Sequence, residues 1–595
     1  MSSSGIPEDL RWLLQPQSIA IVGASDDFGK ISGMPLKYLR RHGYPGAIFP
    51  VNPKYHEVAG IRCYPSLNEV PNPIDLALIT LGVQGVLPVL EACARKQVRS
   101  AVVVASGFGE VGGVGAELQG EISRLAATTG LRVLGPNCQG FVNVHDKVAA
   151  SFTAAMEAEP LVAGTVALVT QSGALGGCLL NVARERRMGL SYWVSTGNEA
   201  DLSAVDVLQF FLRDPRTKVV AAYLEGIKQG DRFVSLADEA LTVGKPLIVL
   251  KVGSSQAGRR AALSHTGALT GSRTAYEALC KGRGIIGVED LDEVLDTVAL
   301  LAAGRPFQGG GLGIITSSGG AGVLLADQCE ALQIPLAEFT ASTEKRLRSI
   351  LPAFGSATNP VDTTAQILTQ PSLLKSCLEV VLADPGVGAL AILLTMVTGG
   401  AAAEAAEAIL EASMLTDKPV VVGWMAGEVV RDAVLTLQAH AIPVFATPLR
   451  LAKALRRLWR YGHVRERLLR EIPPRNPLHD DRCRQASRLL VGLKRPLAEH
   501  ESAVILALYN LPVARQRLVI SPEEAVRAAE EIGFPVALKV QSPQILHKSD
   551  VGALCLNLAG PEAVRAAYQE ILEAARSSHP QAEIQGVLVQ EMLRG

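Results

Sequence analysis

Short apolar runs of ~5 to 8 residues, separated by glycine and proline, recur along most of the chain. Such runs are typical of buried strands, and the amphipathic stretches between them, such as residues 35–41, are typical of helices. Strands that alternate with helices indicate parallel sheets covered by helices on both faces. The pattern therefore predicts an α/β fold with three alternating units, over residues 10–145, 160–300 and 311–465.

The C-terminal part has a different pattern. Residues 466–499 are rich in Arg, Lys and Asp and show no strand pattern, so we expect a linker there. A further domain is expected over residues 500–595. Its Ser-Pro-Glu-Glu run at residues 521–524 is typical of a capping box with proline at the first helical position, which predicts a helix. Strands are expected around Lys539 and over residues 586–592.

Composition limits the class of protein. The chain has 595 residues, 48% of them hydrophobic, and a formal net charge of -1, so no nucleic-acid-binding field is indicated. Apolar runs stop short of the ~18 residues that a membrane span needs, and no secretory signal is visible at the N-terminus. The nine cysteines show neither a CxxC pair nor metal-ligand spacing. We expect a cytoplasmic protein with reduced thiols, no metal ligands within this chain and small-molecule partners.

A glycine-containing turn follows the first expected strand. Such a turn between a strand and a helix offers backbone N–H groups to a phosphate. This turn lacks the specific fingerprints: Gly23 is followed by Ala-Ser rather than by the spacing of GxGxxG, Gly29 follows Gly23 after five residues rather than four, and Ile31 stands where a P-loop needs Ser or Thr. A generic phosphate-binding turn and a mere tight loop both remain open. The candidate residues are Gly23, Ala24, Ser25 and Lys30.

The second and third units repeat one layout, in which a strand is followed by Ser-Gly and then by a helix. Two such helix starts present two sets of unpaired N–H groups, which suits a dianionic phosphoryl group. The alternative is that each serine caps its helix, which we expect in any case. The candidate phosphate-binding residues are Ser172, Gly173, Ser318, Gly319 and Gly320.

One histidine, His265, stands in a loop of small residues that follows the expected strand at 246–252. Small residues allow a bulky charged group to approach the backbone, so we interpret His265 as a phosphoryl carrier. An ordinary loop histidine is the alternative. In the last domain, Lys539 lies on an expected strand and is either a clamp for nucleotide phosphates or a solvated lysine.

Taken together, a collinear set of motifs resembles the NDP-forming acyl-CoA synthetases, which include ADP-forming acetate–CoA ligase and are related to succinyl-CoA synthetase. The motifs are the Gly-Ala-Ser turn at 23–25, Gly-Pro-Asn-Cys at 135–138, Gln-Ser-Gly-Ala-Leu at 171–175, Gly-Asn-Glu-Ala-Asp at 197–201, Leu-Glu-Gly at 224–226, Ser-His-Thr-Gly-Ala-Leu at 264–269, Ser-Gly-Gly-Ala-Gly at 318–322, Asn-Pro-Val-Asp at 359–362, Leu-Lys-Val at 538–540 and His-Lys-Ser-Asp-Val-Gly at 547–552. The resemblance implies a Rossmann-like CoA-binding domain, two flavodoxin-like ligase domains and a partial ATP-grasp domain.

The resemblance also implies roles for individual residues. His265 matches the histidine that becomes phosphorylated, Glu225 the glutamate that orients it, and His547 a second histidine that passes phosphate to ADP. Ser172 and Ser318 match the helix starts that hold the phosphoryl group. Further implied residues are Asn52, Pro53 and Asn137 for CoA, Lys539 and Glu591 for the nucleotide, and Gln171, Ser172, Gly197 and Asn198 near the acyl group.

The chain stops at Gly595, at what resembles the hinge strand of the ATP-grasp fold. We therefore expect the second ATP-grasp subdomain, with its Mg²⁺ ligands, to lie outside this chain. The expected cofactors are CoA, ATP or ADP, and Mg²⁺, and a homo-oligomer is expected by analogy.

The leading hypothesis is an ADP-forming acid–CoA ligase that works through an acyl phosphate and a phosphohistidine. A second hypothesis is a CoA-sensing regulatory module or the ligase-like portion of a protein acetyltransferase, against which the presence of both His265 and Glu225 argues. A third, an NAD(P)-dependent dehydrogenase, is disfavoured because the turn after the first expected strand lacks the GxGxxG spacing. The identity of the acyl group stays open.

Overall fold

The computed structural model describes residues 8–158, 161–258, 260, 272–307, 309–370, 372–471, 477–493 and 495–593. The chain divides into two compact units, Met1–Glu471 and Ile472–Gly595, and each is described by itself. His265 lies outside the described residues.

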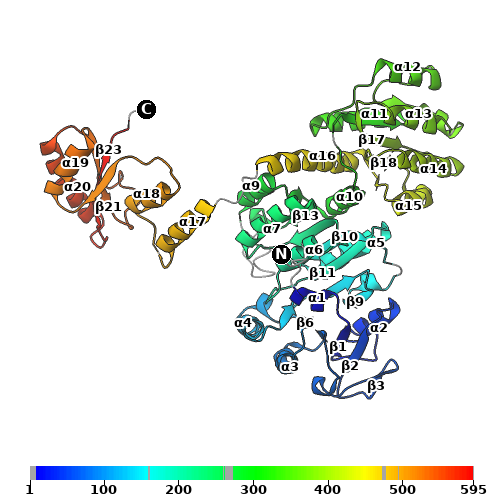
Figure 1. Cartoon of the computed structure of the whole chain (residues 1–595), viewed down its shortest axis with the longest axis horizontal. Coiled ribbons are helices and arrows are strands. Elements are labelled where there is room, and N and C mark those ends of the chain that lie inside the picture. The colour runs from blue at the N-terminus through cyan, green and yellow to red at the C-terminus, as the bar shows by residue number, and fades with distance from the viewer. Residues whose placement is uncertain are drawn as a thin grey trace. The chain divides into compact units, whose positions relative to one another are not determined.

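The first sheet of the larger unit is parallel, with strand order β2-β1-β5-β6-β7 (Figure 1). Every residue of β1, β5 and β6 is buried, as expected for strands with helices on both faces. The strand order reverses beside β1, so a topological switch point lies between β1 and β5. The elements are α1 (Glu8–Leu14), β1 (Ser18–Val22), α2 (Met34–Arg41), β2 (Ala47–Val51), the hairpin β3 (Glu57–Val58) and β4 (Ile61–Arg62), β5 (Leu76–Ile79), α3 (Val83–Arg95), β6 (Ser100–Val103), α4 (Gly113–Thr129) and β7 (Arg132–Leu134).

The second sheet has the order β14-β13-β12-β10-β11-β8-β9. Strands β10 to β14 are parallel and repeat the winding of the first sheet, with the switch point between β10 and β12. Strands β8 and β9 extend it as an antiparallel hairpin, so residues 140–151 hydrogen-bond into the second sheet although we expected a first unit that ended at residue 145. The elements are β8 (Gly140–Asn143), β9 (Val148–Ser151), β10 (Ala163–Thr170), α5 (Gly173–Glu185), β11 (Leu190–Ser195), α6 (Ala204–Arg213), β12 (Val219–Leu224), α7 (Gly230–Val243), β13 (Leu247–Lys251), α9 (Arg273–Arg283), β14 (Ile286–Val288) and α10 (Leu291–Ala302).

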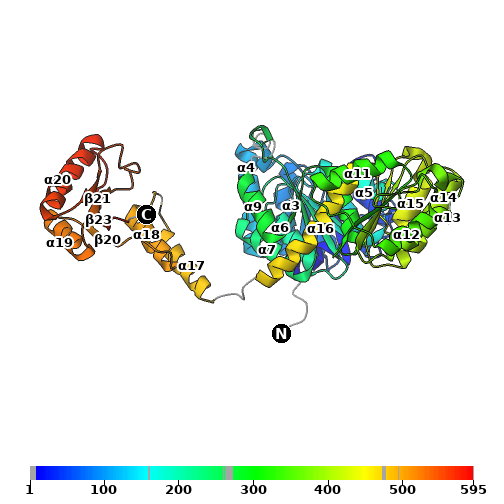
Figure 2. The same ribbon diagram turned by 90° about the horizontal axis from the view of Figure 1, so that it is seen from above.

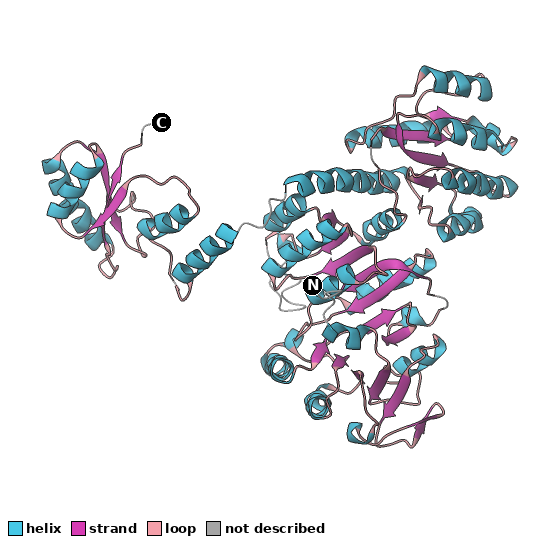
Figure 3. Ribbon diagram, viewed as in Figure 1, coloured by secondary structure: helices cyan, strands magenta, loops and turns pink. Residues whose placement is uncertain are grey.

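The third sheet, β16-β15-β17-β18-β19, is parallel and winds in the same way, with its switch point between β15 and β17. Helices flank its strands (Figure 3). The elements are β15 (Gly311–Thr316), α11 (Gly319–Ala331), α12 (Ala341–Ile350), β16 (Val361–Asp362), α13 (Ser372–Leu382), β17 (Val387–Leu394), α14 (Gly400–Met414), β18 (Val420–Trp424), α15 (Arg431–Ala439), β19 (Val444–Phe445) and α16 (Pro448–Glu471).

Shared cores join the three sheets. One hydrophobic core combines side chains of β1, β5, α1, α6 and β10, and so joins the first sheet to the second. Another combines side chains of β10, α10, α16 and β15, and so joins the second sheet to the third. Because these two cores bury many apolar side chains between the sheets, the larger unit is one packed body. Contacts between its sheets therefore show how the sheets are arranged.

The second and third sheets meet at their amino edges. A cavity of about 100 Å³ between them is lined by Val166 within β10, by Gly189 just before β11, and by Pro443 and Val444 where β19 begins. Ion pairs at the C-terminal end of α5 belong to the same interface, since Arg186 and Arg450 both bind Asp296. The loop before β11 in the second sheet therefore lies near the loop before β19 in the third.

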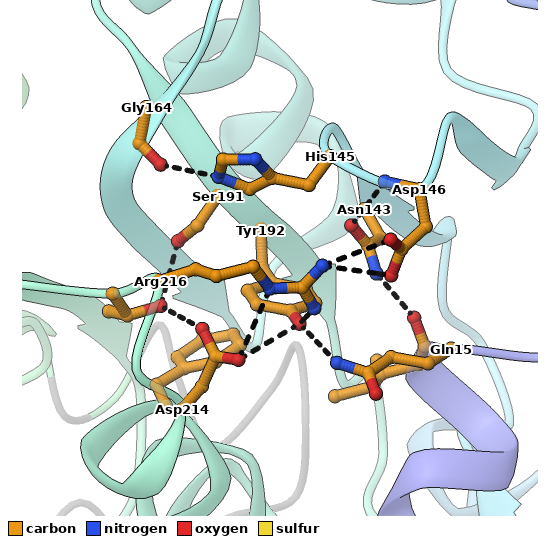
Figure 4. Close-up of polar contacts among 12 residues, drawn as sticks. Gln15, Asn143, His145, Asp146, Gly164, Ser191, Tyr192, Asp214 and Arg216 are labelled. Atoms are coloured by element: carbon orange, nitrogen blue, oxygen red, sulfur yellow. Dashed lines mark hydrogen bonds and ion pairs between the residues drawn. The ribbon is translucent and has the colours of Figure 1, made fainter.

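A polar network fastens α1 to the second sheet (Figure 4). The Arg216 guanidinium donates to the Asp146 carboxylate at 3.0 Å and to Asp214 Oδ1 at 3.3 Å, and it lies 5.3 Å from the centroid of the Tyr192 ring. Gln15 Nε2, just after α1, donates to the Tyr192 hydroxyl at 2.9 Å. The network stands at the amino side of β12, so the opposite edge of the sheet is left for ligands.

The smaller unit is built on an antiparallel sheet with the order β20-β23-β21-β22. Helices α19 and α20 cover one face and form its core, and α18 lies toward the other face (Figures 1 and 2). The elements are α17 (Pro477–Leu490), α18 (Glu499–Leu508), β20 (Gln516–Val519), α19 (Pro522–Ile532), β21 (Val536–Gln541), β22 (Leu554–Leu558), α20 (Pro561–Ser578) and β23 (Gly586–Glu591).

One expectation for this region needs correction. The expected linker over 466–499 includes the end of α16 and all of α17, and its role as a linker stays a prediction. At the start of α19, Ser521 accepts the N–H of Glu524 as expected, but the Glu524 carboxylate accepts the N–H of Ile520 rather than that of Ser521. Within the described ranges, no helix has the length and apolarity to cross a bilayer.

Candidate functional site

The turn expected to bind CoA lies at the switch point of the first sheet. Gly23 directly follows β1, with a φ of +93°, and a Cβ built on it would lie 2.8 Å from Leu81 Cδ2 and 3.0 Å from Thr80 Oγ1, both just after β5. Only glycine fits this backbone conformation and this close approach without strain. The loops of the two switch-point strands are thus packed together where a ligand is expected in this type of sheet.

The other expected CoA residues surround this turn at the same edge of the sheet. Asn52, after β2, donates through Nδ2 to the Ala24 carbonyl at 2.8 Å, and Pro53 is the next residue. Ser25 accepts the N–H of Asp27 at 3.1 Å, while Lys30 forms an exposed ion pair with Asp27. Asn137 is placed apart from these, after β7.

The first and second sheets meet at their carboxyl edges. Asn137, after β7, donates through Nδ2 to Asn198 Oδ1 at 3.1 Å, and Asn198 follows β11 of the second sheet. The N–H of Asn198 also donates to the Pro136 carbonyl at 2.9 Å. The expected CoA edge and the expected phosphate edge are therefore adjacent.

Gln171 and Glu225 meet across the switch point of the second sheet. Gln171 follows β10 and Glu225 follows β12, and Gln171 Oε1 accepts the N–H groups of Glu225 at 2.5 Å and Gly226 at 2.9 Å. Gln171 Nε2 donates to the Gly226 carbonyl at 2.9 Å. The half-buried Glu225 is thus held beside the residue that precedes Ser172.

A lysine that our sequence interpretation missed holds Glu225 from the other side. Lys251, the last residue of β13, donates through Nζ to the carbonyls of Glu225 at 2.8 Å and Val252 at 2.6 Å. Burial lowers the pKa of Lys251, and the Glu225 carboxylate opposes that shift. A polar residue at the carboxyl end of an otherwise apolar strand is a signal that would have found it.

The two repeated helix starts are alike in detail. Ser172 is the N-cap residue of α5 and Ser318 that of α11, and their carbonyls accept the hydroxyls of Thr170 at 3.0 Å and Thr316 at 2.9 Å. The expectation that these serine side chains cap their helices is wrong. Among the described residues, neither hydroxyl accepts a hydrogen bond from the first turn of its helix. Other partners are thus needed for the first-turn N–H groups.

The two helix starts differ in their charge. A Cβ built on Gly319 would lie 2.9 Å from Asp362 Oδ2, so a carboxylate stands beside the α11 start. A carboxylate there weakens the attraction of the helix N-terminus for an anion. Ser172 and Ser318 each lie at the carboxyl edge of their own sheet.

In the smaller unit, Lys539 belongs to a polar cluster on one face of the sheet. Its Nζ donates to Glu499 Oε1 at 2.7 Å and to Gln590 Oε1 at 2.6 Å. His547 is exposed in the loop after β21. Glu591 accepts the backbone N–H and the Nε of Arg515, which together lower the pKa of Glu591.

Four domain families match the chain in order. They are a CoA binding domain at residues 17–144, a succinyl-CoA ligase-like flavodoxin domain at 163–301, a ligase-CoA domain at 312–461 and an ATP-grasp domain at 490–595. The chain is 35% identical to an ADP-forming acetate–CoA ligase I of Archaeoglobus fulgidus over 585 residues, which cover 98% of this chain and 82% of the relative. The chain belongs to the ADP-forming acid–CoA ligase family.

Other members support the same assignment. An ADP-forming 4-hydroxybutyrate–CoA ligase of Nitrosopumilus maritimus is 32% identical over 98% of this chain and 83% of the relative. Acetyl-coenzyme A synthetase 1 of Candidatus Korarchaeum cryptofilum, solved in complex with phosphate and ADP, has a TM-score of 0.72 and 35% identity over 78% of this chain and 99% of that one. The expected family and fold class are confirmed, as is the expectation that this protein is an enzyme.

The competing hypotheses fail against these relatives. Proteins that match nearly the whole chain are named as ligases, so a separate regulatory module and a dehydrogenase are not supported.

The sequence interpretation did not assign a role to Glu199, although the structure connects it directly to Gln171. The roles expected for individual site residues stay predictions.

Proposed function

We propose that this ligase interconverts an acyl-CoA, ADP and phosphate with a carboxylate, CoA and ATP through two intermediates. A phosphate oxygen attacks the thioester carbonyl, which forms an acyl phosphate and releases CoA as its thiol. A ring nitrogen of His265 then attacks phosphorus and releases the carboxylate, which leaves a phosphohistidine. Transfer of the phosphoryl group to ADP gives ATP and restores the histidine.

The observation that best supports this sequence of steps is the contact between Asn137 and Asn198 at 3.1 Å. It sets the carboxyl edge of the CoA-binding sheet against the carboxyl edge that contains Ser172 and Glu225. A thioester held at the first edge can meet a phosphate held at the second, and such proximity is a large part of catalysis.

Glu225 has the role of orienting His265. A carboxylate bonded to one ring nitrogen fixes the tautomer, so that the other nitrogen is the nucleophile. Gln171 and Lys251 hold the backbone of Glu225 from two neighbouring strands, which gives this residue the fixed position that the role requires.

For the nucleotide end we propose Lys539 and Glu591 as binding residues and His547 as the relay. The exposed position of His547 suits a group that must meet a mobile phosphoryl donor. Mg²⁺ neutralises phosphate charge in this type of transfer. In the part of the chain that the structure describes, no group of three or more His, Cys, Asp or Glu side chains could hold a metal ion, so we derive no step through Mg²⁺.

We also propose that the ligase works as a homo-oligomer. In this assembly, Ser172 of one copy and Ser318 of a second copy bind one phosphoryl group. Large apolar side chains near the Ser318 edge are exposed, as a contact with a second copy requires. These side chains are Val323, Leu324, Phe354 and Met396.

Complementation tests this arrangement. A Glu225→Gln chain and a Ser318→Trp chain, each strongly impaired alone, should regain phosphorylation when they are mixed and reassembled, because one of the mixed sites then has both native halves. A mixture as inactive as its components would show that each chain builds its site alone.

The acyl group is to be found by experiment, since one relative is named for acetate and another for 4-hydroxybutyrate. The expected acyl pocket near Gln171, Ser172, Gly197 and Asn198 is part of this proposal. A panel of acyl-CoAs, each mixed with the ligase and phosphate, should give a burst of about one CoA thiol per site for the true substrate. Thiol release that is independent of phosphate would instead indicate a thioesterase.

A further inference from the structure

Glu199 is a buried carboxylate in the loop between β11 and α6. One residue, Gln171, lies between the Glu199 side chain and the proposed phosphoryl site. Glu199 is 8% exposed. Its Oε1 accepts three hydrogen bonds, from Gln171 Nε2 at 2.9 Å, Thr196 Oγ1 at 3.0 Å and the N–H of Ala204 at 2.9 Å. Burial raises the pKa of Glu199 above its ordinary value, and the hydrogen bonds from Gln171, Ala204 and Thr196 oppose that shift.

The Gln171 amide uses its whole hydrogen-bonding capacity. Its oxygen accepts two backbone N–H groups, and its nitrogen donates to Glu199 and to the Gly226 carbonyl. The reversed amide would set its N–H groups against those of Glu225 and Gly226, and its oxygen against two acceptors. Glu199 therefore fixes which way the Gln171 amide points.

We propose that Glu199 and Gln171 are positioning residues of the phosphoryl-transfer site, with Glu199 orienting the Gln171 amide and Gln171 holding Glu225 beside Ser172. This inference rests on the proposed role of Glu225. Because Gln171 directly precedes Ser172 in the chain, one side chain sets the spacing between the loop that holds the phosphoryl group and the loop that holds the carboxylate.

The repeated architecture gives independent support. In the third sheet, Ser317 occupies the position that corresponds to Gln171, and its Oγ accepts the N–H of Thr395, the residue after β17, at 3.1 Å. Both switch points thus use a side chain from the loop ahead of Ser-Gly to hold the backbone after the neighbouring strand. The second sheet, where the acid Glu225 stands in place of Thr395, adds the buried carboxylate Glu199 to this clamp.

The test uses Gln171→Glu, Glu199→Gln, the double variant and wild type, with single-turnover phosphorylation by acyl-CoA and phosphate as the readout. Glu199→Gln keeps an acceptor oxygen and should stay within about 3-fold of wild type, whereas Gln171→Glu sets two carboxylates together and should slow phosphorylation by about 30-fold or more. CoA affinity should change by less than about 2-fold in both. The double variant again sets an amide donor against a carboxylate acceptor. Its phosphorylation rate should therefore be about 10-fold higher than that of Gln171→Glu.

Glu293→Gln is the matched control, because Glu293 is a buried carboxylate that pairs with Lys453 and Arg457 away from this site. It should lower the melting temperature without slowing phosphorylation. If Gln171→Glu does not fold, Gln171→Met replaces it. A Gln171 variant with the wild-type rate, or a double variant no faster than Gln171→Glu, would overturn the inference.

Hydrogen–deuterium exchange provides a readout that does not depend on the proposed reaction. In Gln171→Met, the amides of Glu225 and Gly226 lose their acceptor and should exchange at least about 10-fold faster. Unchanged exchange of these two amides would contradict the clamp even if the wild-type chain proved unable to form a phosphohistidine, and faster exchange would support it in that case.

Discussion

The Lys539 ammonium donates a hydrogen bond to Glu499 Oε1 at 2.7 Å, so the group that we propose for nucleotide phosphate is already paired with a carboxylate. The pair is partly shielded, with 19% of the Lys539 side chain and 34% of the Glu499 side chain exposed. A phosphate that binds Lys539 must compete with Glu499 or repel it. We expect Glu499→Gln to tighten ADP binding by roughly 3- to 10-fold in calorimetric titration.

The control for this prediction is Glu501→Gln on the same helix, since Glu501 pairs with Arg495 rather than with Lys539. Its ADP affinity should equal that of wild type. Weaker ADP binding by Glu499→Gln would show that Glu499 supports Lys539 instead of competing for it.

The CoA turn should be sensitive to a single methyl group. Gly23→Ala forces a Cβ to within 2.8 Å of Leu81 at a left-handed backbone angle, so we expect CoA affinity to fall by about 10-fold or more. Gly60→Ala is the control, because Gly60 also has a positive φ, of +78°, but nothing lies within 4 Å of its added Cβ. If the two variants bind CoA with equal affinity, the turn at Gly23 does not take part in CoA binding.

Ser172 should matter for phosphorylation and little for stability. Its hydroxyl does not cap α5, so Ser172→Ala should cost less than about 0.5 kcal/mol in unfolding free energy, against about 1 kcal/mol for a true cap. Ser203→Ala is the matched control, since Ser203 accepts the N–H of Asp206 at the start of α6. We expect Ser203→Ala to melt earlier and Ser172→Ala to phosphorylate more slowly. The reverse pattern would assign Ser172 a structural role.

Much of this fold could be predicted from the sequence, because the strands are buried on both faces and read as apolar runs. The strand expected at 246–252 is β13 (Leu247–Lys251), and the repeated strand–Ser-Gly–helix layout is present at α5 and α11. Those features depend on neighbours along the chain, which is the information that a sequence pattern contains.

The contacts that position Glu225 could not be predicted in this way. Gln171 and Glu199 are 28 positions apart in the sequence, and Gln171 and Glu225 are 54 apart, so they meet only because β10 lies between β11 and β12. Likewise, nothing in the pattern says which edges of two sheets face each other. That choice is made by packing on α10 and α16, through ion pairs such as Arg450 with Asp296.

Glu199 predicts a pH effect on stability. Its pKa is raised above the ordinary value of 4.5, so the folded protein binds more protons than the unfolded chain just above pH 4.5. Stability contributed by this group therefore falls as the pH rises through that window. Glu199→Gln does not titrate, so its melting temperature relative to wild type should increase from about pH 4.5 upward. A difference between the two melting temperatures that does not vary with pH would contradict the raised pKa.

The central claim is that His265 accepts the phosphoryl group in a site that Glu225 completes, and phosphorylation of the chain measures it most directly. After incubation with the acyl-CoA substrate and labelled phosphate, wild type should hold an acid-labile, base-stable label that maps to His265, and Glu225→Gln should be labelled about 10²-fold more slowly with unchanged CoA affinity. His265→Ala should hold no label. A His265→Ala chain labelled to the wild-type level would contradict the account.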